Sequence, residues 1–451
     1  MTTLRETPTR TGVLTTVLAF TALVTLLTHT MLIPVLPGLP QRLGASPAAT
    51  SWLVTVTVVV GAVANPVLGR LADLFGRKRV LLLAVCAFLL GSLLCALTAD
   101  LTLLIVGRAV QGLSTVAIPL GISLLAALVP PERRAGGIAL ISAMLGIGGA
   151  VALPLAGLIA DVWGFHGLFW FCAAAGLPAL LAVWRLVPSV EPGAERAPVD
   201  LVGATLLIGG LTALLLPLSR GAEWGWDSPL VLGLLGAAAL ALAVFGVVEL
   251  RRRAPLVDLR LAVRAQVLVT NLSAFLTGFA LFVNFLGTVT VLQTRYALSV
   301  VASGLYMLPG GLLMAALSPV AARLISGRGA RFTLLLGSAG VVLGFASRLV
   351  LDSSLWHVVL ATTIISGGAG LAYSAMPALI LDATPPEHAA AANGLNSLAR
   401  TLGSSVASAV FGALAAFGGL TLFFTLGTIT ALLATLVVAV PVATRTVRAP
   451  G

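Results

Sequence analysis

The sequence predicts an all-α membrane protein that is built from two related bundles of transmembrane helices. Three observations lead to this prediction. The 451 residues are 59% hydrophobic and only 9% charged, which leaves too few polar groups to cover the surface of a water-soluble domain. Apolar runs of membrane-spanning length recur along nearly the whole chain. A set of residues in the first half also returns in the second half at a nearly constant offset.

The apolar runs predict fourteen membrane helices, each able to cross a hydrocarbon core of about 30 Å. The first run lacks a small-residue cleavage site and is followed by many others, so we interpret it as a membrane helix and not as a signal peptide. The predicted helices cover residues 13–36, 50–71, 79–99, 101–129, 136–160, 165–187, 201–219, 229–249, 266–292, 300–324, 332–351, 355–381, 388–416 and 419–442.

The cations predict the orientation of these helices. If the N-terminus is cytoplasmic, twenty of the 26 Lys and Arg residues fall on the cytoplasmic side and four at the outer side. Cytoplasmic loops of membrane proteins carry such an excess, and an even number of helices returns the C-terminus to the same side. We therefore expect a multi-pass protein of a cell inner membrane or cytoplasmic membrane with both termini cytoplasmic.

Two stretches carry the internal repeat. The proline turn at residues 130–133 returns at 385–388, after an offset of 255. The first six helices then correspond to the last six, and helices seven and eight are an inserted pair. The expected domains are 1–187, a six-helix bundle; 188–264, a linker with the inserted pair; and 265–451, a second six-helix bundle. At an offset of 253, the repeat also pairs Pro66, Val67, Arg70, Leu71 and Gly76 with Pro319, Val320, Arg323, Leu324 and Gly329.

The stretch GRLADLFGRK at residues 69–78 resembles the signature loop of the major facilitator superfamily. The Trp-Gly-Trp loop at 219–226 and the stretch at 249–261 are similar to the fourteen-span drug:proton antiporter family. This resemblance covers the whole chain. It implies a major facilitator fold and proton-coupled efflux of drugs, antibiotics or related hydrophobic metabolites. The expected partners are a small-molecule substrate, a proton and the lipid bilayer, with no nucleic acid and no cofactor, and the expected state is a monomer.

The resemblance also implies that the signature loop is a conformational clasp. In that family, the acid faces the N-terminus of the thirteenth helix, so Asp73 is expected near Pro386 and Glu387 with Arg77 in support. A carboxylate there gains about 0.3–1 kcal/mol. The alternative is that Asp73 serves only topology and the local cations. Ser326 replaces the acid in the second copy, so we expect no equivalent clasp there. The predicted clasp residues are Gly69, Asp73, Gly76 and Arg77.

A proton-coupling site is predicted where the first and fourth helices meet. Arg108 and Gln111 belong to an R-x-x-Q-G stretch that resembles the family's second motif, in which the arginine serves proton coupling. The alternative is an arginine whose side chain extends to the outer surface. Thr28 stands where the family has an acid, and His29 is the only titratable group nearby. His29 titrates near neutral pH, so it either carries the proton or stays neutral beside Arg108.

The fifth helix contains a stretch similar to the antiporter motif of the family, aligned on Gly149, Pro154 and Gly157. Leu153 and Ala156 stand where the family has glycines, so the match is imperfect. Small residues allow close helix contacts and a proline bends a helix. General helix packing therefore explains the same residues as well as an exporter motif does.

A substrate cavity is predicted around Arg400, which lies about 20 Å along the thirteenth helix and so near the membrane midplane. Interhelical hydrogen bonding is the alternative role for each neutral polar group nearby. Two intramembrane arginines without a deep acid argue against a pocket for organic cations. The residues predicted to line this cavity are Asn271, Asn284, Tyr306, Tyr373, Asn393, Asn396 and Arg400.

Other function classes find little support. Lys78 is the only lysine and no phosphate-binding loop surrounds it, which excludes an ATP-driven transporter on this chain. The four histidines have no metal-ligand spacing and no catalytic constellation is visible, so we expect no enzyme, no catalytic residue and no metal. The remaining alternatives are an importer or uniporter of a small organic metabolite, including an anionic one, and a lipid-handling membrane protein.

Overall fold

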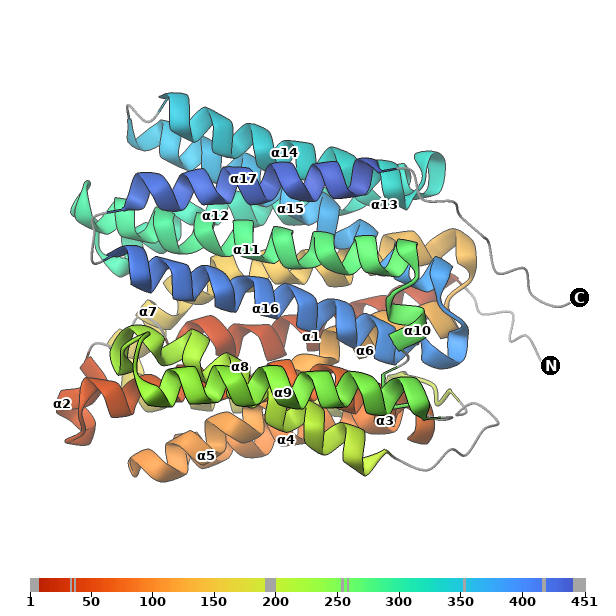
Figure 1. Cartoon of the computed structure of the whole chain (residues 1–451), viewed down its shortest axis with the longest axis horizontal. Helices are drawn as coiled ribbons and strands as arrows, with labels where there is room; N and C mark the ends of the chain where they lie inside the picture. Colours follow the sequence, from red (N-terminus) through yellow and green to blue (C-terminus); the bar gives the residue numbers. More distant parts are fainter. Residues whose placement is uncertain are drawn as a thin grey trace, which may run out of the picture.

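The computed structural model describes residues 8–32, 35, 38–190, 200–252, 255–257, 259–351, 354–415 and 419–440. Every regular element in these ranges is a helix (Figure 1). Serine, aspartate and proline start several of them. The side chains of Ser46, Asp100 and Ser299 accept hydrogen bonds from backbone amides three residues on, at 2.9–3.1 Å, which is how such residues cap a helix.

The first half of the chain forms α1 to α7. Gly164 has φ +70° and turns the chain inside α7, so that the parts before and after it are separate membrane crossings. Before this turn, Pro131–Gly149 and Pro154–Ala160 meet at 49°. The elements are α1 (Pro8–Met31), α2 (Leu39–Leu43), α3 (Pro47–Phe75), α4 (Arg77–Leu97), α5 (Leu101–Gly112), the 3₁₀ helix Leu113–Val116, α6 (Ala117–Leu128) and α7 (Pro131–Leu186).

The second half contains the inserted pair and the C-terminal bundle. The inserted helices are α8 (Leu201–Trp224) and α9 (Pro229–Arg251), followed by the short α10 (Leu259–Ala262). The C-terminal helices are α11 (Ala265–Thr294), α12 (Val300–Ala316), α13 (Ser318–Arg328), α14 (Ala330–Leu351), α15 (Leu355–Ala383), the 3₁₀ helix Pro386–His388, α16 (Ala389–Ala415) and α17 (Leu420–Ala439).

The helices confirm a multi-pass all-α membrane protein, but they do not establish fourteen spans. Twelve helices in the described ranges are long and apolar enough to cross a membrane, and thirteen when the two bent segments of α7 count as one span. The prediction included α16 as a further span. Its 27 residues carry Asn393, Asn396, Arg400 and several serines, which make it too polar to count as a span on composition.

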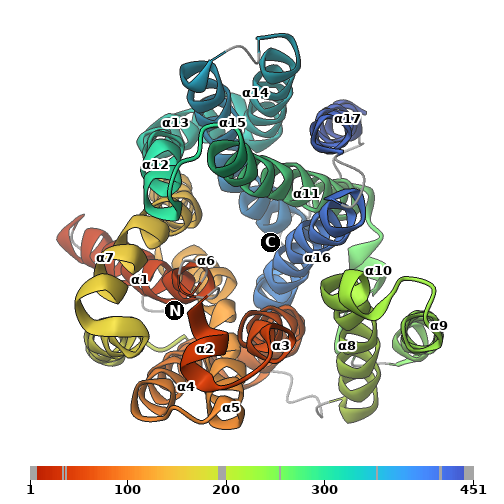
Figure 2. The ribbon, with the colours of Figure 1, turned by 90° about the vertical axis from the view of Figure 1, so that its left-hand side faces the viewer.

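The two bundles meet through long helix pairs. Figure 2, which looks along the helices, shows α1 and α3–α7 on one side and α11–α15 on the other, with α16 beside α3. Across the molecule, α7 packs against α12, α13 and α15. α2 lies at the left-hand end of Figure 1, so α3 ends at the right-hand end. We call this the basic end, because α3 ends and α4 begins there with Arg70, Arg77, Lys78 and Arg79.

The inserted pair packs against both bundles and is attached to the N-terminal bundle by polar contacts at one end. α8 packs against α3 and α16, and α9 lies outside α8 (Figure 2). At one end, the guanidinium of Arg220 stacks 4.4 Å from the ring of Trp52 and donates to the Ser51 hydroxyl at 2.7 Å. At the other end, the Glu249 carboxylate accepts from the Val257 amide at 3.1 Å. Arg220 was expected in the outer loop region, yet only 3% of it is exposed.

Glycines allow α16 to approach two neighbours closely. A side chain at Gly394 would place its Cβ 2.5 Å from the Asn65 carbonyl oxygen of α3. A side chain at Gly403 would collide with the Phe275 carbonyl of α11, and one at Gly278 with the Arg400 carbonyl. Both crossings are therefore contacts of backbone against backbone, the kind that small residues make possible in membranes.

We expect Gly403→Ala to destabilise the protein by about 1–3 kcal/mol, because the added methyl group would force α11 and α16 apart. Thermal unfolding of the purified protein measures this effect. Gly209→Ala in α8 is the matched control, because its Cβ would meet nothing within 4 Å and alanine favours a helix over glycine. Equal unfolding temperatures for the two variants would contradict the close crossing.

Candidate functional site

The carboxylate of Asp73 caps the N-terminus of α16. Its Oδ2 accepts a hydrogen bond from the Ala391 amide at 2.9 Å, and its Oδ1 accepts one from the Ala390 amide at 3.3 Å. Only 1% of the side chain is exposed. These amides have no partner within their own helix, and the positive end of the helix dipole favours an anion there. The contact joins the end of α3 in the N-terminal bundle to the start of α16 in the C-terminal bundle.

Arg77 extends this contact to two further elements. Its Nε and Nη2 donate to Asp73 Oδ1 at 3.2 and 3.1 Å, and Nη1 donates to the Ser123 carbonyl of α6 at 3.2 Å. Nη2 also donates to the Pro386 carbonyl just before α16. Hydrogen bonds to charged groups contribute about 1.5–3 kcal/mol each, and part of that gain offsets the cost of burying the charges. We call Asp73, Arg77 and their partners the clasp.

Two glycines shape the clasp. Gly76 has φ +102° and forms the turn that separates α3 from α4, a conformation that glycine adopts without strain. Gly69 faces α16, where a Cβ would lie 2.9 Å from the Ala390 carbonyl oxygen. The structure therefore brings all four predicted clasp residues together, while Ser326 in the repeated copy is exposed.

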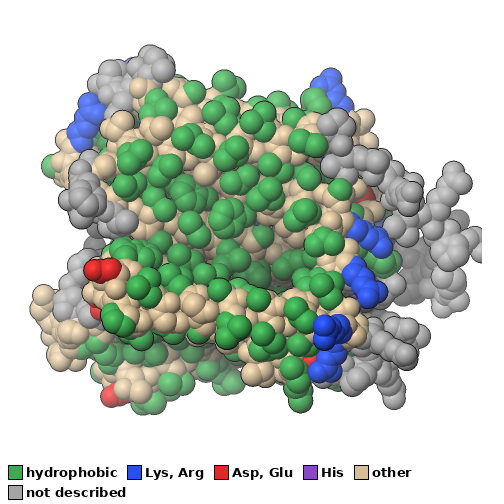
Figure 3. All heavy atoms as spheres, in the orientation of Figure 1, with side chains coloured by type: hydrophobic (Ala, Val, Ile, Leu, Met, Phe, Trp, Pro, Cys, Tyr) green, Lys and Arg blue, Asp and Glu red, His purple; other side chains and the backbone are tan. Residues whose placement is uncertain are grey.

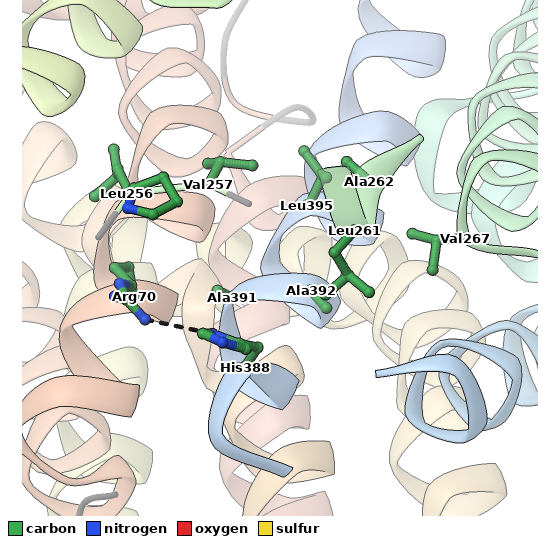
Figure 4. Close-up of a pocket in the computed structure, with 11 residues that line it drawn as sticks. Arg70, Leu256, Val257, Leu261, Ala262, Val267, His388, Ala391, Ala392 and Leu395 are labelled. Carbon is green, nitrogen blue, oxygen red and sulfur yellow. Dashed lines mark hydrogen bonds between the residues drawn. The ribbon is translucent and has the colours of Figure 1, made fainter. Parts of the chain in front are cut away.

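A small pocket lies beside the clasp at the basic end (Figure 4). Arg70 and His388 face each other across it, with Arg70 Nη1 3.4 Å from His388 Nδ1. The rest of the lining comes mainly from the chain before α11 and from the first turns of α16, including Leu256, Leu261 and Leu395. Sequence reasoning did not predict this pocket, although part of its apolar wall belongs to the stretch at 249–261 that resembles the antiporter family.

Arg108 is buried where α1, α3, α4 and α5 meet. Only 1% of the residue is exposed, so the alternative of a side chain that extends to the surface is wrong. Nε donates to the Leu53 carbonyl at 2.9 Å, and Nη1 donates to the Thr28 carbonyl at 3.1 Å and to Gln111 Oε1 at 2.9 Å. Gln111 in turn donates to Ser92 at 2.8 Å. The structure places Arg108 beside the turn of α1 that holds His29, whose side chain lies outside the described residues.

The predicted antiporter motif lies on α7, where this helix faces α12. A Cβ at Gly157 would lie 2.5 Å from Val301 Cγ2, whereas one at Gly149 would meet nothing within 4 Å. Pro154 starts the second segment of the 49° bend. Close packing therefore accounts for Gly157 and the bend involves Pro154, but packing does not explain Gly149.

The predicted substrate cavity is only partly assembled. The guanidinium of Arg400 lies 5.2 Å from the ring centre of Tyr373, and its Nη2 donates to the Ser397 hydroxyl at 3.0 Å. On the same helix, Asn396 donates to Asn271 Oδ1 of α11 at 3.0 Å. Asn393 instead donates to the Ala389 carbonyl of its own helix.

Two predicted cavity residues lie elsewhere. The ring of Tyr306 contacts Trp356 at a centroid distance of 6.1 Å. Trp356 precedes Tyr373 by 17 positions on α15, which is about 25 Å along a helix. Asn284, which is 1% exposed, accepts from Thr362 at 3.3 Å and from Thr288 at 3.4 Å. Both residues were expected beside Arg400, and the structure corrects that expectation.

Asn284 belongs instead to a polar group around Arg348, which sequence reasoning placed at an outer helix end. Arg348 is 4% exposed, donates to Thr288 at 2.6 Å and stacks 3.9 Å from the ring centre of Phe424. The group joins α11, α14, α15 and α17. Only the arginine itself, three residues before the end of an apolar run, could have drawn attention to it.

These features define a class of protein: a polytopic helical membrane protein in which a buried ion pair of one half binds the backbone of the other half at one end of the molecule. Comparison with known families agrees. The family described as Major Facilitator Superfamily matches residues 18–407 and 329–450. The chain belongs to this superfamily.

Individual relatives are distant. The uncharacterized MFS-type transporter Rv1877 of Mycobacterium tuberculosis is 30% identical over 422 residues. The alignment covers 90% of this chain but 60% of that protein, so the chain spans well under two thirds of its length. The tetracenomycin C resistance and export protein of Streptomyces glaucescens is 31% identical over 84% of this chain and 71% of that protein.

A solved structure shows the same fold. The human organic anion transporter MFSD10 (TETRAN) superposes with a TM-score of 0.73 over 96% of this chain and 100% of that chain. The sequences are 19% identical, so this likeness concerns the fold alone.

We expect Asp73→Asn to weaken the clasp, because the amide has no charge to offer Arg77 or the first turn of α16. The loss of about 1.5–3 kcal/mol of charge-assisted bonding should speed hydrogen exchange at the Ala390 and Ala391 amides by about tenfold or more. Mass spectrometry of the peptide that starts at Pro386 measures this exchange rate.

Asp382→Asn is the control for this experiment, since Asp382 is an exposed acid at the end of α15 and the change removes the same charge without touching the clasp. Unchanged exchange in the Asp73 variant, or an equal increase in both variants, would show that Asp73 serves only the membrane topology and the local cations.

Proposed function

We propose that this chain is a fourteen-span exporter of drugs, antibiotics or related hydrophobic metabolites that works by alternating access and is driven by protons. The observation that carries the proposal is the clasp. It joins α3 of one half to α16 of the other through buried charged groups at the basic end. Two related halves around a midplane site are what alternating access requires, and a contact of this kind has to break when the basic end opens.

The fourteen-span arrangement rests on α16. Its 27 residues extend about 40 Å as a helix, longer than the hydrocarbon core of about 30 Å. α16 also runs alongside α11 through the length of the bundle (Figure 1). When α16 and the bent part of α7 are added to the twelve candidate spans, the count is fourteen. The proposed domains are 1–187, 188–264 and 265–451.

We propose that the basic end faces the cytoplasm, where both termini then lie. Figure 3 shows Lys and Arg side chains along the right-hand edge, a further group at the upper left, and a broad apolar surface between the two ends. The excess of cations in the loops of this end, as counted in the sequence, supports the orientation.

We expect the Trp224–Trp226 loop to be extracellular and the turn at Lys78 to be cytoplasmic. A cysteine placed at Asp227, which is exposed, should react with a membrane-impermeant maleimide in intact cells. A cysteine at Lys78 should react only after the cells are opened, in a background without the three native cysteines. The reverse labelling pattern would contradict the orientation.

The polar groups near Arg400 favour a substrate that is neutral or anionic and accepts hydrogen bonds. Arg400 and Tyr373 present a cation and a phenol, and the Asn271–Asn396 pair adds two amides. Among the described side chains, no carboxylate lies within 4.0 Å of Arg400. The relative named for tetracenomycin C resistance and export supports efflux of an antibiotic-like compound.

Proton coupling is the second half of the proposal. Its candidates are His29, Arg108 and Gln111, of which the last two are hydrogen-bonded to each other. The missing acid in the first helix favours a second candidate function, an importer or uniporter. A transport assay separates these candidates, because an antiporter accumulates substrate on the side that protons leave, a proton-coupled importer accumulates it on the side that protons enter, and a uniporter accumulates none.

The test is uptake into proteoliposomes with an imposed pH gradient and a panel of neutral, anionic and cationic compounds. We expect pH-driven accumulation, and Arg400→Gln should lower the apparent affinity for anionic compounds by about tenfold, the effect of losing one charge-assisted contact. Arg400→Lys keeps the charge and serves as the control. Downhill movement without accumulation would favour the uniporter, and equal losses for neutral and anionic compounds would exclude Arg400 from recognition.

A further inference from the structure

The guanidinium of Arg108 has two N–H groups without a partner among the described residues. A guanidinium carries five N–H donors. One on Nε and two on Nη1 bind the Leu53 and Thr28 carbonyls and Gln111 Oε1, at 2.9–3.1 Å. The two on Nη2 are buried and bind nothing in the described structure. Leaving a buried donor of a charged group unpaired costs more than any single contact nearby returns.

The charge of Arg108 is also uncompensated. All three groups that accept its hydrogen bonds are neutral, and none of the ion pairs in the described part of the chain involves it. An intramembrane arginine normally pairs with an acid or faces water. At 1% exposure Arg108 faces no bulk water, so the site lacks a counter-charge.

The unpartnered side of Arg108 borders a small pocket between α1, α5 and α7. The pocket has room for about one water-sized group, which excludes an organic substrate. Its other walls are mostly apolar. Besides Arg108, they are Thr28, Met31, Leu32, Leu168, Phe169 and Cys172.

We propose that this pocket binds one small monatomic anion, chloride in the cell, which accepts the two Nη2 donors and neutralises Arg108. A water molecule would satisfy the same donors but would leave the positive charge in an apolar surrounding, where a charge without a partner is strongly disfavoured. The Thr28 side chain and the Cys172 thiol line the same pocket. The thiol can donate a weak hydrogen bond to the anion, whereas the Thr28 hydroxyl donates to the Thr25 carbonyl at 2.7 Å. The inference concerns binding and does not depend on the direction or the coupling of transport.

Binding of radiolabelled chloride to the purified protein tests the proposal. In gluconate buffer of constant ionic strength, we expect saturable binding of one chloride per chain that bromide displaces and gluconate does not. The unfolding temperature in the same buffers should rise with chloride and bromide but not with gluconate, because a ligand that binds the native state stabilises that state. No saturable chloride binding, or equal stabilisation by all three anions, would overturn the proposal and leave water in the pocket.

Two variants at Thr28 locate the site. Thr28→Asp places a fixed carboxylate in the pocket beside Arg108 and should weaken chloride binding by about tenfold or more, because two like charges then compete for one cation. Thr28→Asn has nearly the same shape without the charge and should keep chloride binding within about threefold of the unmodified protein. If both variants bind chloride as the unmodified protein does, or if both lose binding equally, any bound chloride lies elsewhere.

Discussion

The relative placement of the two bundles depends on one electrostatic contact, the carboxylate of Asp73 at the first amides of α16. A carboxylate that is 1% exposed must have partners, and Asp73 has two amides and a guanidinium. Arg77 then fixes α6 and the chain before α16 to the same point. Water can replace each of these partners when the bundles separate, so the contact holds the closed end firmly and still allows it to open.

Inside the bundles, three arginines offset the cost of burial in two ways. Arg348 lies against the ring of Phe424 and binds threonine hydroxyls, and Arg400 lies over Tyr373 and binds Ser397. Both arrangements use the weakly hydrated, planar guanidinium, which stacks on aromatic faces. Arg108 has no aromatic partner among its contacts and relies on carbonyl and amide oxygens, which satisfy donors but not charge. This difference sets Arg108 apart as the site that needs a counter-ion.

The sequence predicted the clasp better than the cavity for a physical reason. Asp73 and Arg77 are four residues apart on one short stretch, so their contact is local and a motif can carry it. Residues of the cavity come from different helices, and their positions depend on the direction of each side chain. Helical side chains point toward the N-terminus of their helix. Arg348, near the end of α14, therefore reaches into the bundle, whereas Tyr306, near the start of α12, points away from it toward Trp356.

Packing also explains why α16, although predicted as a membrane helix, is more polar than a helix that faces lipid. A helix that faces lipid must be apolar around much of its surface, as α9 is on the outside of the molecule (Figure 2). α16 packs against α3, α6, α8, α11, α15 and α17, so little of its surface faces lipid. Small residues let those neighbours approach, and its asparagines, serines and arginine find partners in them. None of the described side chains of α16 is exposed, and this helix carries both the clasp contact and Arg400.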